Sequence, residues 1–182
     1  MSAPLYIALV HHPVRDKTGG IVTTAITNLD VHDLARTAKT YGLAGYFVVT
    51  PVTAQRKIVD AILAHWTRGP GRARVPQRGE ALALVRPVQS IEEALGAVGS
   101  ATVVATAAAP GERQVVSFAD EAARLRCAEE PTLLLFGTGH GLADAVLDGA
   151  DRLLAPIRPG GYNHLSVRAA VAITLDRLLG DG

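Results

Sequence analysis

The chain has 182 residues and a formal net charge of +1, with 48% hydrophobic and 19% charged residues. This length fits one domain with a single hydrophobic core, and the composition excludes a disordered chain. The near-neutral charge excludes recognition of a polyanion through net charge alone, so such a partner would have to meet a local basic patch. We therefore predict a single domain over residues 1–182.

Five short apolar runs predict the strands of the fold. Each run is continuous rather than alternating in hydrophobicity, which is typical of parallel strands covered on both faces. Pro4 and Pro13 bound the first run, and Pro51 ends the second. In chain order the runs cover residues 5–10, 45–50, 101–106, 132–136 and 153–156.

Amphipathic patterns between these runs predict helices. The first pattern has Val31, Leu34 and Ala38 on one face and a glycine stop at Gly42. Alternation of strands and helices indicates an α/β fold, with a mainly parallel sheet and helices on both faces. In such sheets ligands bind beyond the carboxyl ends of the strands. The predicted helices cover residues 30–42, 53–66, 117–130 and 166–179.

One segment departs from this alternation. Residues 67–79 are rich in glycine, proline and arginine, and we predict an exposed loop there rather than a domain boundary. Arginine side chains pair with phosphates and stack on unpaired bases. The loop is therefore either an RNA-binding element or a solvated flexible segment. Its arginines are Arg68, Arg72, Arg74 and Arg78.

The cysteine count and the absence of long apolar stretches limit the class of protein further. The single cysteine, Cys127, excludes an intramolecular disulfide and a cysteine metal cluster, so we expect no metal site. The N-terminus lacks the pattern of a signal peptide. No apolar stretch approaches the roughly 20 residues that span a bilayer. We expect a cytoplasmic protein that does not bind membranes.

A glycine-rich turn follows the fourth apolar run, where residues 136–142 read FGTGHGL. A phosphate-binding P-loop needs a lysine that this turn lacks, and the dinucleotide fingerprint needs G-x-G-x-x-G in place of G-x-G-x-G. A nicotinamide-dependent enzyme would also need an acidic ribose partner, for which the nearby aspartates are poorly spaced. The turn serves either a different ligand or the close packing of protein backbone.

Two further segments of small residues also follow predicted strands. They read ATAAAP at residues 105–110 and PIRPGGYNHLS at residues 156–166. Loops that follow parallel strands meet at the same edge of a sheet. Together with the glycine turn, these loops can hold a planar, polar ligand mostly through backbone groups.

Three segments, in order, resemble the motifs of the SPOUT family of RNA methyltransferases. NLDVHDLARTAKTYG at residues 28–42 is similar to the first motif, FGTGHGL to the second, and PIRPGGYNHLSVRAAVAI at residues 156–173 to the third. The resemblance extends from about Leu5 to Leu179. It implies a C-terminal trefoil knot, S-adenosylmethionine (SAM) as the cofactor, an RNA substrate such as tRNA or rRNA, and a homodimer.

The resemblance also implies which residues hold the cofactor. In this family the knotted loops form the cofactor site, which contacts the ligand largely through backbone groups. The residues that match these loops by position are Thr106, Ala107, Gly137, Thr138, Gly139, His140, Gly141, Leu142, Ile157, Arg158, Asn163, His164, Leu165 and Ser166.

Candidates for the catalytic groups lie in the first motif. Arg36 matches the family arginine that approaches the acceptor or its phosphate, and Asn28 matches the opening asparagine, which would orient the acceptor. Asp30 or Asp33 offers a carboxylate that can take a proton. Each has a structural alternative, namely an ion pair of Arg36 with Asp33 and a helix cap at Asn28 or Asp30.

The sequence thus predicts a SAM-dependent RNA methyltransferase that modifies a nucleotide of tRNA or rRNA. The alternative is a regulatory protein of the same fold that binds SAM and RNA without transferring the methyl group. A base nitrogen, a base carbon and a ribose hydroxyl all stay open as the acceptor.

Overall fold

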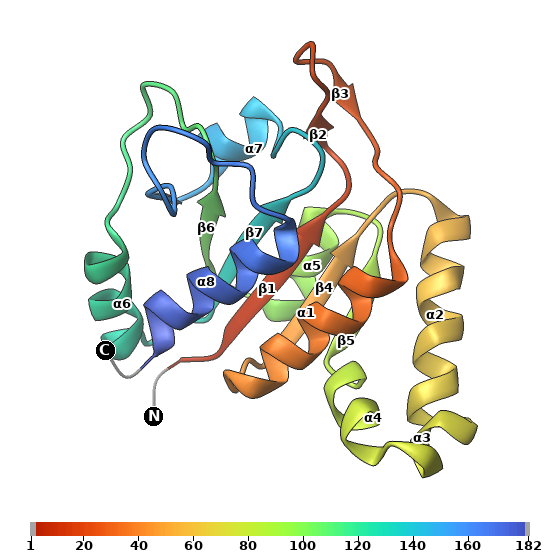
Figure 1. Cartoon of the computed structure of the whole chain (residues 1–182). Helices are drawn as coiled ribbons and strands as arrows, with labels where there is room; N and C mark the ends of the chain where they lie inside the picture. Colours follow the sequence, from red (N-terminus) through yellow and green to blue (C-terminus); the bar gives the residue numbers. More distant parts are fainter. Residues whose placement is uncertain (1–2, 181–182) are drawn as a thin grey trace.

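A six-stranded parallel sheet forms the centre of the protein (Figure 1). The computed structural model describes residues 3–180, in which the strands of this sheet lie in the order β5-β4-β1-β7-β6-β8. Every neighbouring pair is parallel. The strands are β1 (Leu5–Val10), β4 (Gly45–Val49), β5 (Val85–Val88), β6 (Thr102–Thr106), β7 (Thr132–Gly137) and β8 (Arg152–Leu154).

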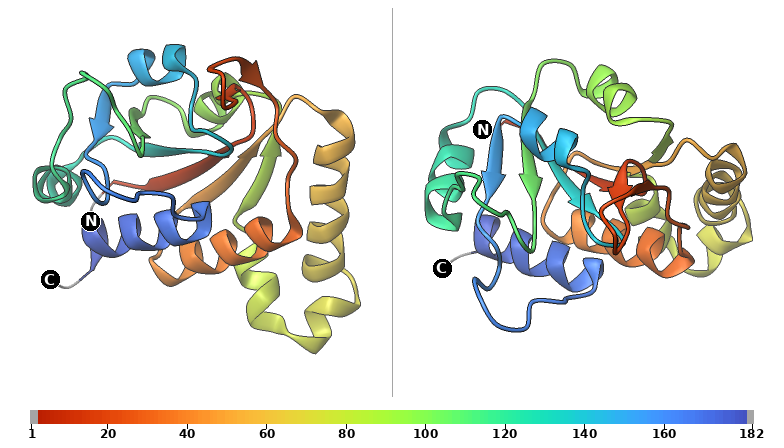
Figure 2. Two further views of the ribbon diagram at one scale, coloured as in Figure 1. Left: turned by 45° about the horizontal axis from the view of Figure 1, so that its top comes forward. Right: turned by 90° about the horizontal axis from the view of Figure 1, so that it is seen from above.

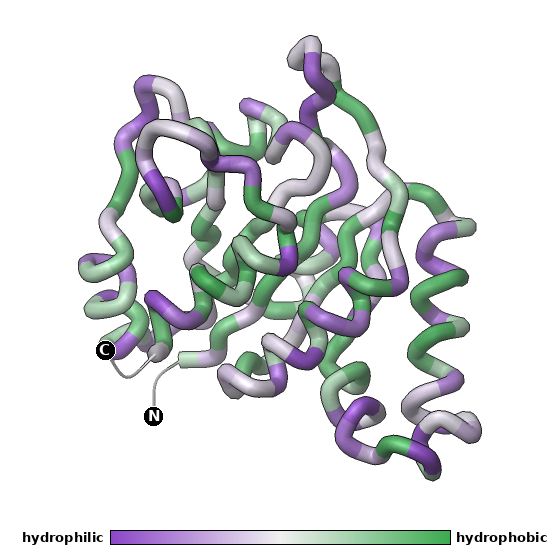
Figure 3. The backbone as a smooth tube through the Cα atoms, in the orientation of Figure 1, coloured by the Kyte–Doolittle hydropathy of each residue, from purple (hydrophilic) through white to green (hydrophobic). Residues whose placement is uncertain are grey.

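Hydrophobic side chains cover both faces of the sheet, as the continuous apolar runs predicted. Ile7 and Val48 belong to the core on one face, and Ala8 and Phe47 belong to the core on the other. Each of these four residues is at most 1% exposed. Burial of one large aliphatic or aromatic side chain stabilises the fold by roughly 1.5–3 kcal/mol. The strands therefore appear as an apolar centre between helices of mixed polarity (Figure 3).

Helices cover the two faces unequally (Figure 2). This arrangement confirms the predicted α/β architecture. No helix among residues 3–180 is long and apolar enough to cross a lipid bilayer. One face carries α1 (Asn28–Thr40), α2 (Thr53–Thr67), α4 (Pro76–Leu82), α6 (Phe118–Cys127) and α8 (Val167–Leu179), the other carries α5 (Ile91–Val98) and α7 (Asp144–Gly149), and the short α3 (Pro70–Arg74) connects α2 with α4.

Hydroxyl side chains begin three of the helices that the sequence predicted. Thr27 accepts a hydrogen bond from the backbone N–H of Asp30 at 3.1 Å, and Ser117 accepts one from Asp120 at 3.0 Å. Ser166 caps α8 in the same way. Caps of this kind contribute about 1 kcal/mol each. All four predicted helix starts are correct to within two residues.

The prediction of an exposed loop over residues 67–79 is wrong, because α3 and α4 occupy it. Pro70 and Pro76 are the first residues of these helices, where the fixed φ of proline suits the first turn and its missing N–H costs nothing. A Cβ at Gly79 would lie 2.6 Å from the carbonyl oxygen of Trp66. The prolines thus mark helix starts, and this glycine allows α4 to pack closely on the end of α2.

Local sequence patterns did not predict β5, α5 or a small hairpin formed by β2 (Val14–Arg15) and β3 (Ile21–Val22). β5 contains Arg86 and Pro87, which interrupt its apolar run and are tolerated because β5 lies at the edge of the sheet. The hairpin is antiparallel and projects beyond the carboxyl edge of the sheet (Figure 1). It contacts the glycine turn and therefore shapes the candidate site.

Candidate active site

The three small-residue loops leave the sheet side by side. β7, β6 and β8 are adjacent and parallel, so their C-terminal ends meet at one edge. The side-chain amide of Asn163 donates to the carbonyl oxygen of Ala108 at 2.9 Å, which joins the third loop to the first. The Thr106 hydroxyl donates to the carbonyl oxygen of Leu135 at 2.9 Å. The predicted convergence of the loops is confirmed.

The glycine turn after β7 packs against the β2–β3 hairpin. The backbone N–H of His140 donates to the carbonyl oxygen of Arg15 at 3.1 Å, and the N–H of Arg15 donates to the carbonyl oxygen of Gly141 at 2.9 Å. The hydroxyl of Thr138 is hydrogen-bonded to that of Thr24. These bonds fix the conformation of the turn from the hairpin side.

Close approach of protein backbone explains the glycines of this turn. A Cβ at Gly137 would lie 2.5 Å from the backbone nitrogen of Leu142, and one at Gly139 would lie 3.3 Å from the carbonyl oxygen of Arg15. Gly139 and Gly141 have positive φ angles of 59° and 100°, which L side chains rarely adopt. The turn therefore needs its glycines without any ligand, and cofactor contact at residues 137–142 stays a prediction.

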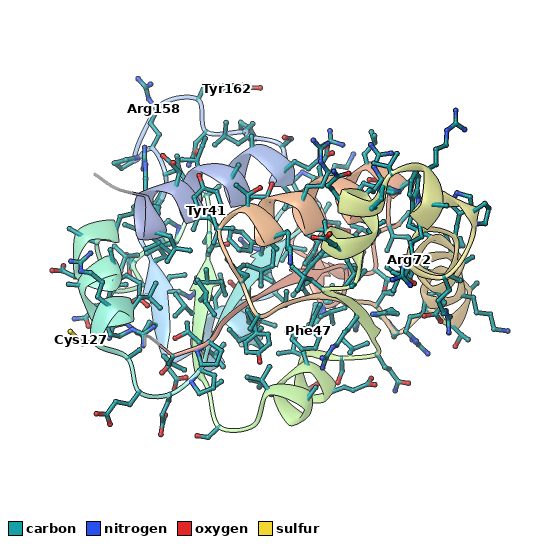
Figure 4. All side chains as sticks on the ribbon, turned by 90° about the horizontal axis from the view of Figure 1, so that it is seen from below. Tyr41, Phe47, Arg72, Cys127, Arg158 and Tyr162 are labelled. Carbon is teal, nitrogen blue, oxygen red and sulfur yellow. The ribbon has the colours of Figure 1, made fainter. Side chains whose placement is uncertain are left out.

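The third loop, residues 155–166, is only partly held against the rest of the protein. The guanidinium of Arg177 donates to the carbonyl oxygen of Ile157 at 2.7 Å. Tyr162 is 83% exposed, and its ring centre lies 5.1 Å from that of His164. Figure 4 shows Arg158 and Tyr162 extending away from the body of the protein. Among the predicted cofactor residues of this loop, the exposed ones are Arg158, His164, Leu165 and Ser166.

The Asp30 carboxylate lies at the start of α1, beside the start of α8. The Thr27 hydroxyl donates to this carboxylate at 2.7 Å, which completes a reciprocal cap. The Arg168 guanidinium on α8 lies 3.8 Å from the Asp30 carboxylate and 3.9 Å from that of Asp33. Capping and ion pairing account for Asp30 within the protein, and its role as a proton acceptor stays a prediction.

Arg36 and Asn28 present their side chains on the surface of α1. Arg36 is 62% exposed, and its guanidinium lies 4.0 Å from the Asp33 carboxylate. An exposed ion pair of this kind contributes about 0–1 kcal/mol, so it leaves Arg36 available to an anionic ligand. Asn28 is the first residue of α1 and is exposed, while Thr27 performs the capping that was the structural alternative for Asn28.

A groove of about 640 Å³ between α1, α2 and α4 brings together residues that the sequence analysis treated separately. Two catalytic candidates, Asn28 and Arg36, line it together with Arg78. The sequence analysis did not identify Trp66 as a site residue, although this is the only tryptophan and ends the apolar stripe of α2. The groove is lined by Asn28, Leu29, His32, Asp33, Arg36, Ile58, Ala61, Ile62, His65, Trp66 and Arg78.

Aromatic and cationic side chains meet at one wall of this groove. The guanidinium carbon of Arg78 lies 4.7 Å from the centre of the Trp66 ring, in a cation–π contact. Burial and the nearby charge of Arg78 lower the pKa of His32, against the opposing charge of Asp33. Arg78 is half-buried, which differs from the predicted exposed loop over residues 67–79. The other three arginines of that segment are exposed.

Two buried polar side chains, His11 and Tyr46, lie close enough to Asp30 for its charge to act on them. Burial lowers the pKa of His11 to about 4, against the opposing effect of Asp30. Burial and the charge of Asp30 together raise the pKa of Tyr46 well above its ordinary value. His11 Nδ1 lies 3.0 Å from Thr24 Oγ1, and its Nε2 has no hydrogen-bond partner among the described residues. A neutral imidazole therefore follows the end of β1.

Residues 4–180 match a family described as SAM-dependent RNA methyltransferase. The chain belongs to this family. It is 49% identical over 183 residues to an Oleidesulfovibrio alaskensis protein named tRNA (guanine-N(1)-)-methyltransferase. The aligned region covers 97% of this chain and 42% of that protein. An uncharacterized protein of Aquifex aeolicus is 35% identical over 179 residues, 96% of this chain and 87% of the other. The chain thus spans about two fifths of the length of the more similar relative.

Solved methyltransferase structures share the fold. TrmJ from Z. mobilis superposes with a TM-score of 0.64 at 19% identity, over 100% of this chain and 70% of the other. An AdoMet-bound rRNA methyltransferase from Sinorhizobium meliloti superposes with a TM-score of 0.58 at 18% identity, over 98% of this chain and 56% of the other. The SPOUT fold expected from the motifs is confirmed. The trefoil knot stays a prediction. The hydrogen bond from Asn163 to Ala108 is compatible with it, since it joins the third loop to the first.

Proposed function

We propose that the chain is a SAM-dependent RNA methyltransferase that modifies a nucleotide of tRNA. The observation that supports this most is the convergence of the three small-residue loops, two of which carry motifs of the family, at one edge of the sheet in a chain of this family. The name of the O. alaskensis relative favours tRNA over rRNA. More than half of that relative lies outside the matched region, so its guanine-N1 specificity is not carried over.

The three loops are proposed to hold SAM. The first loop offers three consecutive alanines at residues 107–109, and a Cβ added at Gly160 or Gly161 would meet no atom within 4 Å. Small side chains leave this edge open and leave backbone groups available, which fits a flat, polar nucleoside. When bound, SAM supplies a methyl group on a sulfonium centre. Thr106 and Asn163 would define the boundary of its site.

Arg36 and Asn28 are proposed to position the acceptor nucleotide. The Arg36 guanidinium would bind a phosphate of the RNA, and the Asn28 amide would hydrogen-bond to the acceptor group. Alignment of the acceptor is the main contribution that a protein makes to a displacement reaction. Asp30 would take the proton that the acceptor loses, and the Arg168 guanidinium lies 3.8 Å from its carboxylate.

Calorimetry with S-adenosylhomocysteine, the demethylated product, tests the cofactor site. We expect saturable binding at micromolar protein, because the loops would recognise the nucleoside moiety that the cofactor and its product share. A chain that binds neither this compound nor SAM would overturn the proposed function.

Methyl transfer is tested with tritiated SAM and undermethylated tRNA, with rRNA in a parallel reaction. Digestion of the labelled RNA to nucleosides then identifies the methylated atom. Arg36→Ala should lower kcat/KM about 10- to 100-fold, the effect of one charge-assisted hydrogen bond, and leave cofactor affinity unchanged. Lys39→Ala, an exposed cation on the same helix, is the matched control. Binding of both ligands without transfer would indicate the regulatory alternative.

We also propose that the working form is a homodimer, as the family resemblance implies. Leu165 and Tyr162, beside the candidate site, are 45% and 83% exposed. Their coverage by a second chain would remove apolar surface from water, at about 25 cal/mol for each Å². Sedimentation equilibrium at micromolar protein should give twice the mass of the chain, and a monomer at all concentrations would contradict this proposal.

A further inference from the structure

We propose that the groove between α1, α2 and α4 binds a nucleobase of single-stranded RNA, which stacks on Trp66 beside the acceptor nucleotide. The proposal rests on the proposed function, since it assigns a second contact surface for the same RNA substrate. It adds a base-binding site that lies apart from the three loops assigned to the cofactor.

The apolar part of the groove supplies a platform for stacking. Trp66, which is half-buried, lines the groove together with Ile58 and Leu29, which are 53% and 60% exposed. Large aliphatic side chains gathered in an exposed concave site indicate a ligand surface rather than ordinary solvated protein. An aromatic ring flanked in this way accepts any nucleobase, because every base has a π-face.

The charges around the groove select a polyanion over a neutral partner. Arg36 and Arg78 line it, and Asp33, the single acidic residue of the lining, lies within 4.0 Å of both Arg36 and Arg168. The acidic charge is thus shared between two cations, which leaves the groove positive. Three further exposed arginines follow along the end of α2 and α3, namely Arg68, Arg72 and Arg74. Such a row of cations fits the phosphates of an RNA strand.

Polar side chains in the groove suit the edges of a base. Asn28 and two histidines, His32 and His65, belong to the lining. The neutral form of an imidazole offers one donor and one acceptor, and an amide offers both. Bases that are splayed out of an RNA strand are read through this combination of stacking and edge hydrogen bonds.

The position of the groove connects it to the candidate active site. Asp33 lies in the lining, and Arg168, which is 3.9 Å from it, stands in the first turn of α8 directly after the third loop. Arg36, whose guanidinium lies 4.0 Å from the Asp33 carboxylate, lines the groove as well. An RNA strand with one base on Trp66 therefore has a path over Arg36 towards the loops assigned to the cofactor.

Trp66 is the only tryptophan of the chain, so its fluorescence reports on the groove directly. Titration of the chain with a short single-stranded oligoadenylate should quench this emission saturably, because stacking on a base quenches indole. An abasic oligomer of equal length and charge should bind weakly and leave the emission almost unchanged. Equal quenching by both oligomers, or none by oligoadenylate at saturation of an anisotropy signal, would refute the proposal.

A matched pair of surface variants tests the site without disturbing the core. Ile58→Asp places a carboxylate in the groove, and Val115→Asp places one at a 41% exposed position between β6 and α6, outside the groove. Both change the net charge equally. We expect Ile58→Asp to raise the Kd for oligoadenylate about tenfold, because a carboxylate in the groove repels the phosphates next to the bound base, while Val115→Asp keeps the wild-type Kd. Equal effects of the two variants would refute the proposal.

Failure of this proposal is distinguishable from failure of the proposed function. SAM-dependent methylation of tRNA without quenching by oligoadenylate would refute base binding in the groove and support the proposed methyltransferase activity. Quenching by oligoadenylate in a chain that binds no SAM would support base binding in the groove and refute the proposed methyltransferase activity. A tryptophan emission that depends on protein concentration and not on RNA would assign the groove to contact with a second copy and refute the base site.

Discussion

Protonation of His11 should destabilise the protein as the pH falls. The imidazole is 1% exposed, and burial lowers its pKa from 6.5 to about 4. Its Nδ1 lies 3.0 Å from the Thr24 hydroxyl, and no acidic side chain among the described residues is hydrogen-bonded to it. The folded protein therefore disfavours the charged form, whereas the unfolded chain takes up the proton in water without this penalty.

The size of the effect follows from the interval between the two pKa values. A group whose folded pKa is depressed contributes stability that is fully present above the unfolded pKa of 6.5 and is lost as the pH falls towards 4. At about 1.4 kcal/mol for each unit, the loss between pH 7 and pH 5 amounts to about 2 kcal/mol. Few carboxylates titrate in this window. His32, whose pKa burial also lowers, contributes there equally in the wild type and in a His11 variant, so the difference between the two proteins isolates His11.

Urea unfolding at several pH values between 7 and 5 measures this loss. His11→Asn keeps a polar atom for Thr24 but cannot titrate, so its free energy of unfolding should fall by about 2 kcal/mol less than that of the wild type. Thr24→Val is the control, because it lowers stability yet keeps the imidazole and hence the pH dependence. Parallel curves for the wild type and His11→Asn would refute the assignment of the buried, neutral state to His11.

Three further predictions concern stability and are measured by urea unfolding at pH 7. Gly137→Ala should destabilise by about 2 kcal/mol, since its Cβ would meet backbone atoms at 2.5 and 2.8 Å; a neutral effect would show that the turn is free to move. Gly96→Ala, inside α5 with nothing within 4 Å of the added Cβ, should stabilise by up to about 1 kcal/mol. Glu121→Gln should cost about 3 kcal/mol, because the fully buried carboxylate lies 2.6 Å from Arg124 and 2.7 Å from Arg152, and a loss below 1 kcal/mol would contradict that account.

Local patterns predicted the parts of the fold in which each residue's environment follows from its immediate neighbours. The central strand β1, with Ile7 and Leu9, is a continuous apolar run because it is covered on both faces. The edge strand β5 escaped prediction because Arg86 and Pro87 are tolerated only where one side of a strand is open. Whether a strand lies at an edge is a property of the whole sheet, and a local window does not contain it.

Local sequence patterns likewise predicted one part of the candidate site and not the other. Three loops that follow strands were predicted to converge, because parallel strands end at a common edge. The groove was not predicted, since it depends on how α4 packs against α2 after the short helix α3. From the sequence, Trp66 was interpreted as part of an apolar stripe, and Arg78 as part of an exposed loop that either binds RNA or is only solvated. Only the packing of Gly79 against Trp66 places this arginine over the ring.

The glycine turn shows how a distant segment decides between two interpretations of one motif. In the sheet order, β7 lies between β1 and β6, so the turn has the hairpin that follows β1 on one side and the first loop on the other. The hairpin side is filled, because a Cβ at Gly139 would meet Thr24 and Arg15. A cofactor bound at this turn, as proposed, would therefore lie on the side that faces the loops after β6 and β8, where Asn163 joins those two loops. The missing side chains at 137, 139 and 141 serve the close backbone contacts and the backbone angles of the turn itself, so a ligand there would depend on the small residues of the first loop.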